Sequence, residues 1–244
     1  MPFCPTLINR MASVLNIEFE KSPFLPSVTG LLREMNKTRF FSHGLLIGSW
    51  PMLVYSEHFS LPYGLATNDI DFAIDNVVRV PAAAGKTIPQ MLERLGYTAV
   101  QDYSGIETFL QGTFEVEFIT HRRGGSGPPS VVIPPWKISA QPLPFIDLLF
   151  IRPITVNIED FSIRIPSPEA LMLHKFIVAQ RRAGRDKEFK KEKDLQQCSG
   201  LADIVRSEEI VQIIGEYRLS KDTQKSMLES CAAIEYTLPQ LGSK

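Results

Sequence analysis

The chain of 244 residues has an ordinary balance of side chains, with 44% hydrophobic residues, 22% charged residues and a formal net charge of −1. This length is sufficient to bury a sizeable core, as one large domain or two small ones. The balanced charge excludes the strongly basic composition that favours non-specific nucleic-acid binding and the acidic composition of a solvating tail.

The cysteines and the apolar runs bear on where the protein resides. Cys4, Cys198 and Cys231 show neither paired nor metal-ligand spacing, which favours a reducing compartment over a disulfide framework. Residues 1–16 lack the basic start and the unbroken apolar run of a signal peptide. No apolar run approaches the length that spans a bilayer. The sequence therefore predicts a cytoplasmic protein without a membrane partner.

Strand and helix patterns alternate through the first two thirds of the chain. Apolar residues recur at helical spacing in 25–37, whereas short β-rich runs bounded by turn residues predict strands. The expected elements, in chain order, are helix 25–37, strand 43–48, helix 50–58, loop 61–65, strand 69–74, helix 88–95, strands 108–110 and 113–120, a long loop over 122–144, and strands 147–152, 155–158 and 162–165.

The pattern changes after Pro166, because every later periodic segment is helical. These expected helices are 167–182, 186–197, 201–217 and 221–236. The sequence therefore predicts an α+β protein with a mixed domain over 1–165 and a helical C-terminal domain over 166–244.

Gly48 and Ser49 lie between a predicted strand and a predicted helix. Glycine allows a phosphate to approach the backbone, and serine caps a helix or donates a hydroxyl hydrogen. The free N–H groups and the dipole at a helix start favour an anion. Taken alone, the pair is better explained by an ordinary strand-to-helix turn with a serine cap, because Gly-Ser is common.

Asp69 and Asp71 lie two residues apart on a predicted strand, so their side chains project from one face. Two adjacent carboxylates repel unless a cation lies between them. Mg²⁺ prefers such oxygen ligands together with substrate phosphates and water. The alternative is a pair of solvent-facing aspartates on an edge strand.

Glu115 and Glu117 alternate with apolar residues on a later strand. If this strand pairs beside 69–74, one glutamate joins the aspartates. We expect Glu117, with Glu115 as the alternative, to complete a metal site or to act as a base toward a hydroxyl. Without that pairing, both belong to an ordinary half-exposed strand.

Cations in the helical part provide candidate phosphate partners. Lys175 and Arg182 are seven residues apart and share a helical face, and Lys193 follows on the next helix. The alternative is a solvated basic face. The basic run 181–193 is interleaved with acids and has Phe189 as its one aromatic residue, so it lacks the stacking platforms of a nucleic-acid module, and no DNA binding is expected.

The order of these motifs is more specific than any one of them. Gly-Ser before a helix, then Asp-x-Asp and then a later acidic strand resembles the polymerase-β-like nucleotidyltransferase superfamily. Thr67 stands where a small polar residue often precedes the acidic pair. Five segments also resemble a bacterial group of nucleotidyltransferase-fold proteins that is distantly similar to the toxin-type enzymes of abortive infection. These segments are residues 43–74, 140–143, 168–175, 179–182 and 193–197.

The resemblance implies a small mixed sheet with flanking helices, followed by a helical region that closes over the nucleotide, with Lys175 facing the phosphates. It implies transfer of an NMP from an NTP such as ATP to a hydroxyl on a protein, an RNA or a small molecule, with Mg²⁺ or Mn²⁺ and release of pyrophosphate. Active members commonly carry Asp where this sequence has Glu117. The alternative is therefore a degenerate protein that binds nucleotides without turnover.

Overall fold

A computed structural model describes residues 15–65, 67–75, 87–122, 124–125, 127–182 and 185–239. Its helices are α1 (Pro26–Lys37), α2 (Trp50–Phe59), α3 (Ile88–Arg94), α4 (Pro168–Ala179), α5 (Arg185–Ala202), α6 (Ser207–Tyr217) and α7 (Lys221–Ala233). Its strands are β1 (Asn16–Phe19), β2 (Gly44–Leu46), β3 (Asp69–Ile74), β4 (Thr98–Gln101), β5 (Glu107–Gln111), β6 (Phe114–His121), β7 (Val131–Ile133), β8 (Ile138–Leu143), β9 (Ile154–Ile158) and β10 (Phe161–Ile165). Two short 3₁₀ helices, η1 (Phe40–Ser42) and η2 (Ile146–Phe150), complete the described elements.

The larger sheet is mixed and has the strand order β2-β3-β6-β5-β4. β3 runs parallel to β6, whereas β2, β5 and β4 pair antiparallel with their neighbours. The β7–β8 hairpin continues the sheet, because β8 pairs with the C-terminal part of β6. A smaller sheet has the order β1-β9-β10.

Hydrophobic side chains fix the register of β3 against β6. Ile70, Phe72, Val116 and Phe118 are buried on one face, and the rings of Phe72 and Phe118 stack 5.7 Å apart. A slip of one residue would expose these side chains and bury the carboxylates of the opposite face. The core therefore determines which face of the sheet carries the acidic residues.

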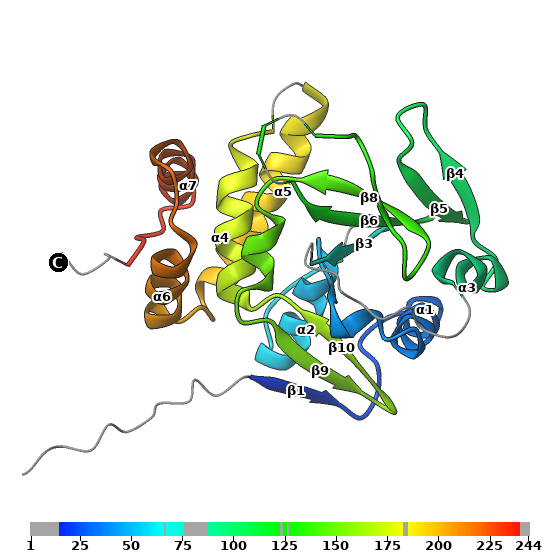
Figure 1. Cartoon of the computed structure of the whole chain (residues 1–244). Helices are drawn as coiled ribbons and strands as arrows, with labels where there is room; N and C mark the ends of the chain where they lie inside the picture. The colour runs from blue at the N-terminus through cyan, green and yellow to red at the C-terminus, as the bar shows by residue number, and fades with distance from the viewer. Residues whose placement is uncertain are drawn as a thin grey trace, which may run out of the picture.

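The helical layer covers the sheet on one side. In Figure 1, α4 and α5 lie between the strands and the outer pair α6 and α7. Most of α4 is buried, as its position between two layers requires. The predicted α+β fold, with a small mixed sheet, flanking helices and a helical C-terminal region, is confirmed. The domain boundary after residue 165 stays a prediction.

Two predictions of secondary structure are wrong. Residues 147–152 were expected to form a strand, but η2 occupies this position after Phe145, whose φ is 65°. The short apolar run does not distinguish a strand from a helical turn by periodicity. The loop expected over 122–144 contains β7 and β8, because its β-branched runs form strands despite the surrounding glycines and prolines.

The remaining differences concern edges and boundaries. The sequence did not predict β1 and β4, which lie at the outer edges of their sheets, and all four residues of β4 are exposed. Helix α5 extends to Ala202, and α6 begins only at Ser207. In the part of the chain that the structure describes, no helix has the length and apolarity needed to cross a bilayer. Cys4 and most of the segment examined for a signal peptide lie outside the described residues.

Candidate active site

The Gly48-Ser49 turn connects β2 to α2 and lies directly against β3. The Ile47 amide donates a hydrogen bond to the Asp71 carbonyl at 2.9 Å, which fixes the turn beside this residue. Gly48 has a φ of +74°, and a Cβ at this position would collide with Oδ2 of Asp71. Only glycine therefore fits both the backbone conformation and the space.

Ser49 begins α2, but its side chain does not cap the helix. Its Oγ instead accepts a hydrogen bond from Nε2 of Gln197 in α5, at 3.0 Å. The expected capping role is wrong, because a long-range partner holds the hydroxyl. The hydroxyl still lies at a helix start, where an anion is favoured.

The backbone of Asp69 is held from both sides. The indole Nε1 of Trp50 donates to the Asp69 carbonyl at 2.7 Å, and the Asp69 amide donates to Oγ1 of Thr67 at 3.3 Å. Thr67 thus orders the start of the acidic strand through the main chain. The backbone from which the Asp69 carboxylate projects is therefore held in place.

The acidic side chains meet across two strands, because Asp69 is paired in register with Glu115 and Asp71 with Glu117. The pKa of Asp71 is raised to about 6 by burial first and by the Asp69 carboxylate second, while Lys175, Lys190 and Lys193 act in the opposite direction. Burial likewise raises the pKa of Glu117 to about 7, followed by repulsion from Asp71, Glu115 and Asp69. Such mutual repulsion is typical of carboxylates that share a cation.

The predicted cations Lys175, in α4, and Arg182, in the turn after it, share one carboxylate. Lys175 Nζ lies 3.0 Å from Asp194 Oδ1, and Arg182 Nε lies 2.6 Å from Asp194 Oδ2. Lys175 and Asp194 are each 5% exposed, and the two cations lower the pKa of Asp194 although burial alone would raise it. The shared partner brings Lys175 and Arg182 together, but the prediction that both lie on one helical face is wrong, because α4 ends at Ala179 and Arg182 follows it. Whether they contact phosphates stays a prediction.

Two hollows border the aspartates on the basic side. Gly48, Asp71, Lys175 and Arg182 line a hollow of about 300 Å³ between the sheet and α4. A second hollow, of about 570 Å³, is lined by Thr67, Asp69 and Lys193 together with aromatic side chains from α2, β6 and α5. Burial lowers the pKa of Lys193 and the nearby Lys175 charge adds to the effect, while Asp69 acts against it.

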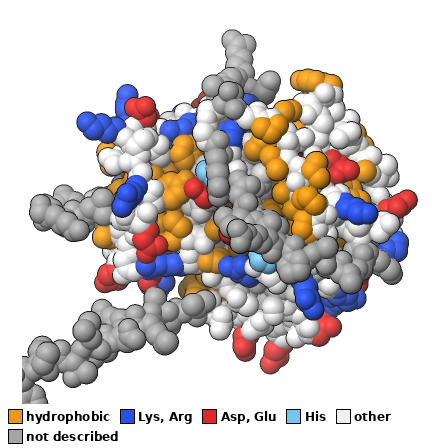
Figure 2. Space-filling view, in the orientation of Figure 1, with side chains coloured by type: hydrophobic (Ala, Val, Ile, Leu, Met, Phe, Trp, Pro, Cys, Tyr) orange, Lys and Arg blue, Asp and Glu red, His pale blue; other side chains and the backbone are white. Residues whose placement is uncertain are grey.

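A third hollow, of about 300 Å³, lies on the other side of the carboxylates. Glu115 and Glu117 line it, together with residues of β4, β5 and β8. The predicted site residues other than Ser49 therefore line three hollows, two of which contain cations and aspartates and the third the two glutamates. On the face shown in Figure 2, basic and acidic side chains are interspersed, as in the run 181–193.

Whether these residues could hold a metal ion by themselves depends on how closely their side chains lie together. Among the described residues, no three or more His, Cys, Asp or Glu side chains gather closely enough to hold an ion by themselves. Mg²⁺ does not require such a cage, because it usually binds one or two carboxylates together with waters and substrate phosphates. The Asp69/Asp71 pair, with its raised Asp71 pKa, fits an ion that arrives with a nucleotide.

The profile of a nucleotidyltransferase family matches residues 27–218, which include every candidate site residue. The chain belongs to this family. Its membership supports an NTP substrate and transferase chemistry in general. A search of curated proteins found no match.

Two solved structures are similar to the chain at low sequence identity. A nucleotidyltransferase-like antigenic protein from Paracoccidioides brasiliensis is 12% identical, with a TM-score of 0.38, and the match covers 85% of this chain and 95% of that one. A tRNA nucleotidyltransferase, crystallised with a primer tRNA and an incoming ATP analogue, is 15% identical with a TM-score of 0.28. That match covers 84% of this chain and 60% of the enzyme.

Sequence reasoning did not include Asp194, Gln197 and Tyr63 among the site residues. Asp194 and Gln197 are three positions apart on α5, so they face the same neighbours, and both are buried. Polar residues at core-facing positions of a helix are the signal that could have identified them, since buried polar groups need partners. Tyr63 lies in the loop after α2, where periodicity gives no signal.

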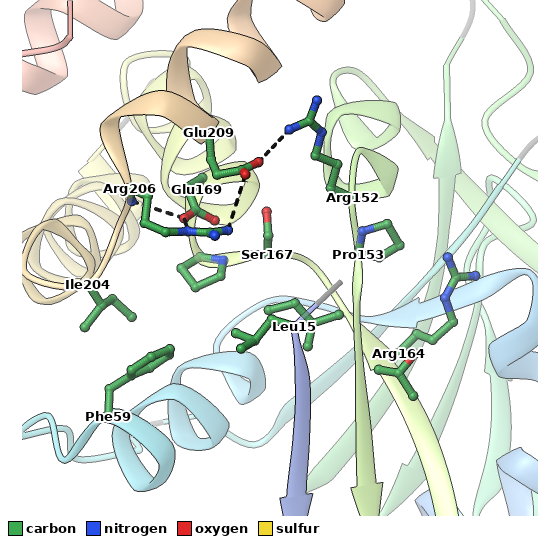
Figure 3. Close-up of a pocket in the computed structure, with 13 residues that line it drawn as sticks. Leu15, Phe59, Arg152, Pro153, Arg164, Ser167, Glu169, Ile204, Arg206 and Glu209 are labelled. Carbon is green, nitrogen blue, oxygen red and sulfur yellow. Dashed lines mark hydrogen bonds and ion pairs between the residues drawn. The ribbon is translucent and has the colours of Figure 1, made fainter. Parts of the chain in front are cut away.

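A further hollow lies at the opposite end of α4, with a volume of about 550 Å³. Figure 3 shows its ion pairs, in which Glu169 Oε1 accepts from the Arg206 amide at 3.1 Å and from the Arg206 Nε at 3.3 Å. Arg152 Nη1 lies 2.6 Å from Glu209 Oε2. The Glu169 contacts connect the starts of α4 and α6, the Arg152 pair connects the segment after η2 to α6, and the hollow contains no predicted site residue.

Proposed function

We propose that the protein is a metal-dependent nucleotidyltransferase that moves an NMP from an NTP to a hydroxyl acceptor and releases pyrophosphate. The observation that carries this proposal is the register of β3 and β6, which pairs Asp71 with Glu117 beside the Gly48 turn. Carboxylates, a glycine-lined helix start and cations then border one centre, as phosphoryl-group chemistry requires.

In the proposed reaction, the turn at Gly48 and Ser49 binds the β- and γ-phosphates through backbone N–H groups and the hydroxyl. The acceptor oxygen attacks the α-phosphorus, and its proton passes to the carboxylate of Glu117. A pKa of about 7 suits such a base near neutral pH. The bond from the α-phosphorus to the bridging oxygen breaks, and pyrophosphate leaves with that electron pair beside Lys175 and Arg182.

Asp69 and Asp71 are the residues that would hold Mg²⁺ or Mn²⁺, with Glu117 as a further ligand where it does not act as the base. A bound divalent ion supplies positive charge that neutralises the triphosphate and the leaving group. In its absence, the charge of the aspartates is offset in part by Lys175, Lys190 and Lys193.

The acceptor class stays open among a protein hydroxyl, an RNA end and a small molecule. The distant resemblance to abortive-infection toxins and the cytoplasmic location likewise stay predictions. The acceptor would approach from the hollow lined by Glu115 and Glu117, opposite the cations that face the nucleotide.

The test uses NTPs labelled on the α-phosphate or on the γ-phosphate, with Mg²⁺ and a cell lysate as the source of acceptors. Transfer is expected to carry only the α-label into product and to release the γ-label as pyrophosphate. The control is the double variant Asp69→Ala/Asp71→Ala, which should transfer neither label. Equal labelling by the control and the unaltered protein would refute the proposal.

A second candidate function is nucleotide binding without turnover. The lack of a gathered three-carboxylate group among the described residues, together with Glu at position 117, favours it. Mg²⁺-dependent ATP binding without α-label transfer to any acceptor would support this alternative over the transferase.

A further inference from the structure

Helix α5 contacts the candidate phosphate site from the helical side. Asp194 and Gln197 lie three residues apart on its inner face, and Gln197 is 3% exposed. Asp194 binds Lys175 of α4 and Arg182 just after it, and Gln197 binds the turn at the start of α2. One turn of α5 thus contacts both sets of groups to which the proposed function assigns phosphates.

The side-chain amide of Gln197 has two N–H hydrogens and one acceptor oxygen. Nε2 lies 3.0 Å from Ser49 Oγ and 3.0 Å from the Tyr63 hydroxyl oxygen. The Tyr63 hydroxyl in turn donates to the Ser49 carbonyl at 3.4 Å. Both amide hydrogens therefore have an acceptor, whereas the buried Oε1 has no partner among the described residues.

This arrangement limits the direction of the Ser49 hydroxyl. Because Gln197 donates to Oγ, that oxygen accepts, and the Ser49 hydrogen must be directed at another group. The Tyr63 hydroxyl oxygen is one acceptor within its reach. The hydroxyl also lies at the start of α2, beside the Gly48 backbone, where a phosphate oxygen would compete for the same hydrogen.

We propose that Gln197 is a positioning residue that holds the Ser49 hydroxyl as a hydrogen-bond donor toward the β- or γ-phosphate of the nucleotide. This inference rests on the proposed function for the identity of the ligand, but phosphate binding alone tests it. Asp194 acts in parallel, because its two oxygens orient Lys175 and Arg182 while further N–H groups of these cations remain for an anion.

The experiment compares Gln197→Glu and Gln197→Met with the same changes at Gln196. Gln196 is the preceding residue of α5 and is exposed, so its variants match the chemical change without touching Ser49. The probes are inorganic tripolyphosphate and Mg²⁺·ATP, with affinity measured by isothermal titration calorimetry. Thermal unfolding of every variant reports whether the fold is retained.

We expect Gln197→Glu to weaken tripolyphosphate binding about tenfold or more, because the carboxylate accepts the Ser49 hydrogen that the phosphate needs. Gln197→Met, which is neutral and similar in size, is expected to weaken binding about threefold and serves where the charged variant does not fold. Neither Gln196 variant should change the affinity. In a Ser49→Ala background, Gln197→Met should add no further loss, since it acts through that hydroxyl.

Unchanged tripolyphosphate affinity in Gln197→Met would overturn the inference. An equal loss of affinity from Gln197→Met with and without Ser49→Ala would also overturn it, because it would show that Gln197 acts through packing and not through the Ser49 hydroxyl. If the unaltered protein binds neither probe, the inference and the proposed function both fail. If it binds both probes but transfers no label, only the transferase function fails, and the Gln197 results still decide the inference.

Discussion

Replacing Asp71 by asparagine should make the metal-free protein more stable while it removes the proposed activity. Asp71 combines a desolvated carboxylate with two acidic neighbours, Asp69 and Glu117. Asn has nearly the same shape and no charge, so it keeps the packing against Gly48 and removes the repulsion. The expected gain depends on pH, because it arises only where Asp71 is ionised.

The sign and the size follow from the pKa of Asp71, which the fold raises from 3.8 to about 6. The folded state holds the proton more tightly than the unfolded state, so stability falls as the pH rises through the window from 3.8 to about 6. Each pKa unit corresponds to about 1.36 kcal/mol, so above this window the ionised Asp71 lowers the free energy of unfolding by at most about 3 kcal/mol. Solvent screening at this partly exposed group reduces the expected gain for Asp71→Asn to about 1–3 kcal/mol.

Urea unfolding in EDTA, at pH values above and below this window, measures the difference in free energy between variant and unaltered protein. Asp203→Asn is the matched control, because Asp203 is exposed just after α5 and undergoes the same chemical change. We expect the gain only for Asp71→Asn and only at the higher pH. A gain that is equal at both pH values, or a loss at the higher one, would refute the electrostatic reasoning.

Three other substitutions test separate parts of the structure. Gly48→Ala should lower the free energy of unfolding in urea by about 1–3 kcal/mol, because alanine would be strained at a positive φ and would collide with Asp71. The control Gly30→Ala, in open space on α1, should be neutral or stabilising. Glu117→Gln should lower the rate of α-label transfer by about 10²-fold or more, whereas Glu115→Gln should lower it by less than about tenfold; the reverse order would make Glu115 the base. Glu169→Gln should lower the free energy of unfolding by about 1–3 kcal/mol, because it weakens the hydrogen bonds to Arg206. Tripolyphosphate affinity, measured by calorimetry, should stay unchanged, because Glu169 lies at the far end of α4 from the candidate site.

Local patterns in the sequence were sufficient to predict the acidic face of the sheet. Alternation in 69–74 and 114–119 separates carboxylates from apolar side chains, and the buried partners Phe72 and Phe118 then leave a single register. The Gly48-Ser49 turn was likewise predictable, since a strand followed by Gly-Ser and a helix favours an anion at that helix start. These predictions depend on short-range spacing, which sequence preserves.

Contacts between distant segments were not predictable in the same way. Gln197 and Ser49 are 148 residues apart, and no periodic pattern relates one to the other. The wrong prediction of a strand at η2 has the same cause, because tertiary packing rather than local propensity decides there between a strand and a helical turn. Lys175 shows both effects, because its place on a helix followed from spacing, whereas its pairing with Asp194 required the position of α5.

The charges of the site argue that the predicted boundary after residue 165 does not separate two functions. The strands supply the carboxylates, whereas α4 and α5 supply Lys175, Lys190 and Lys193, which lower the pKa of Asp71 against burial and repulsion. Without the helices, the acidic face would lose this compensation together with the Gln197 bond to Ser49. The buried Tyr55 hydroxyl also donates to the Pro166 carbonyl at 2.5 Å, across the boundary itself. The helical region is therefore a wall of the candidate site, and in the proposed function its lysines and Gln197 would help to determine how strongly the site attracts a phosphate.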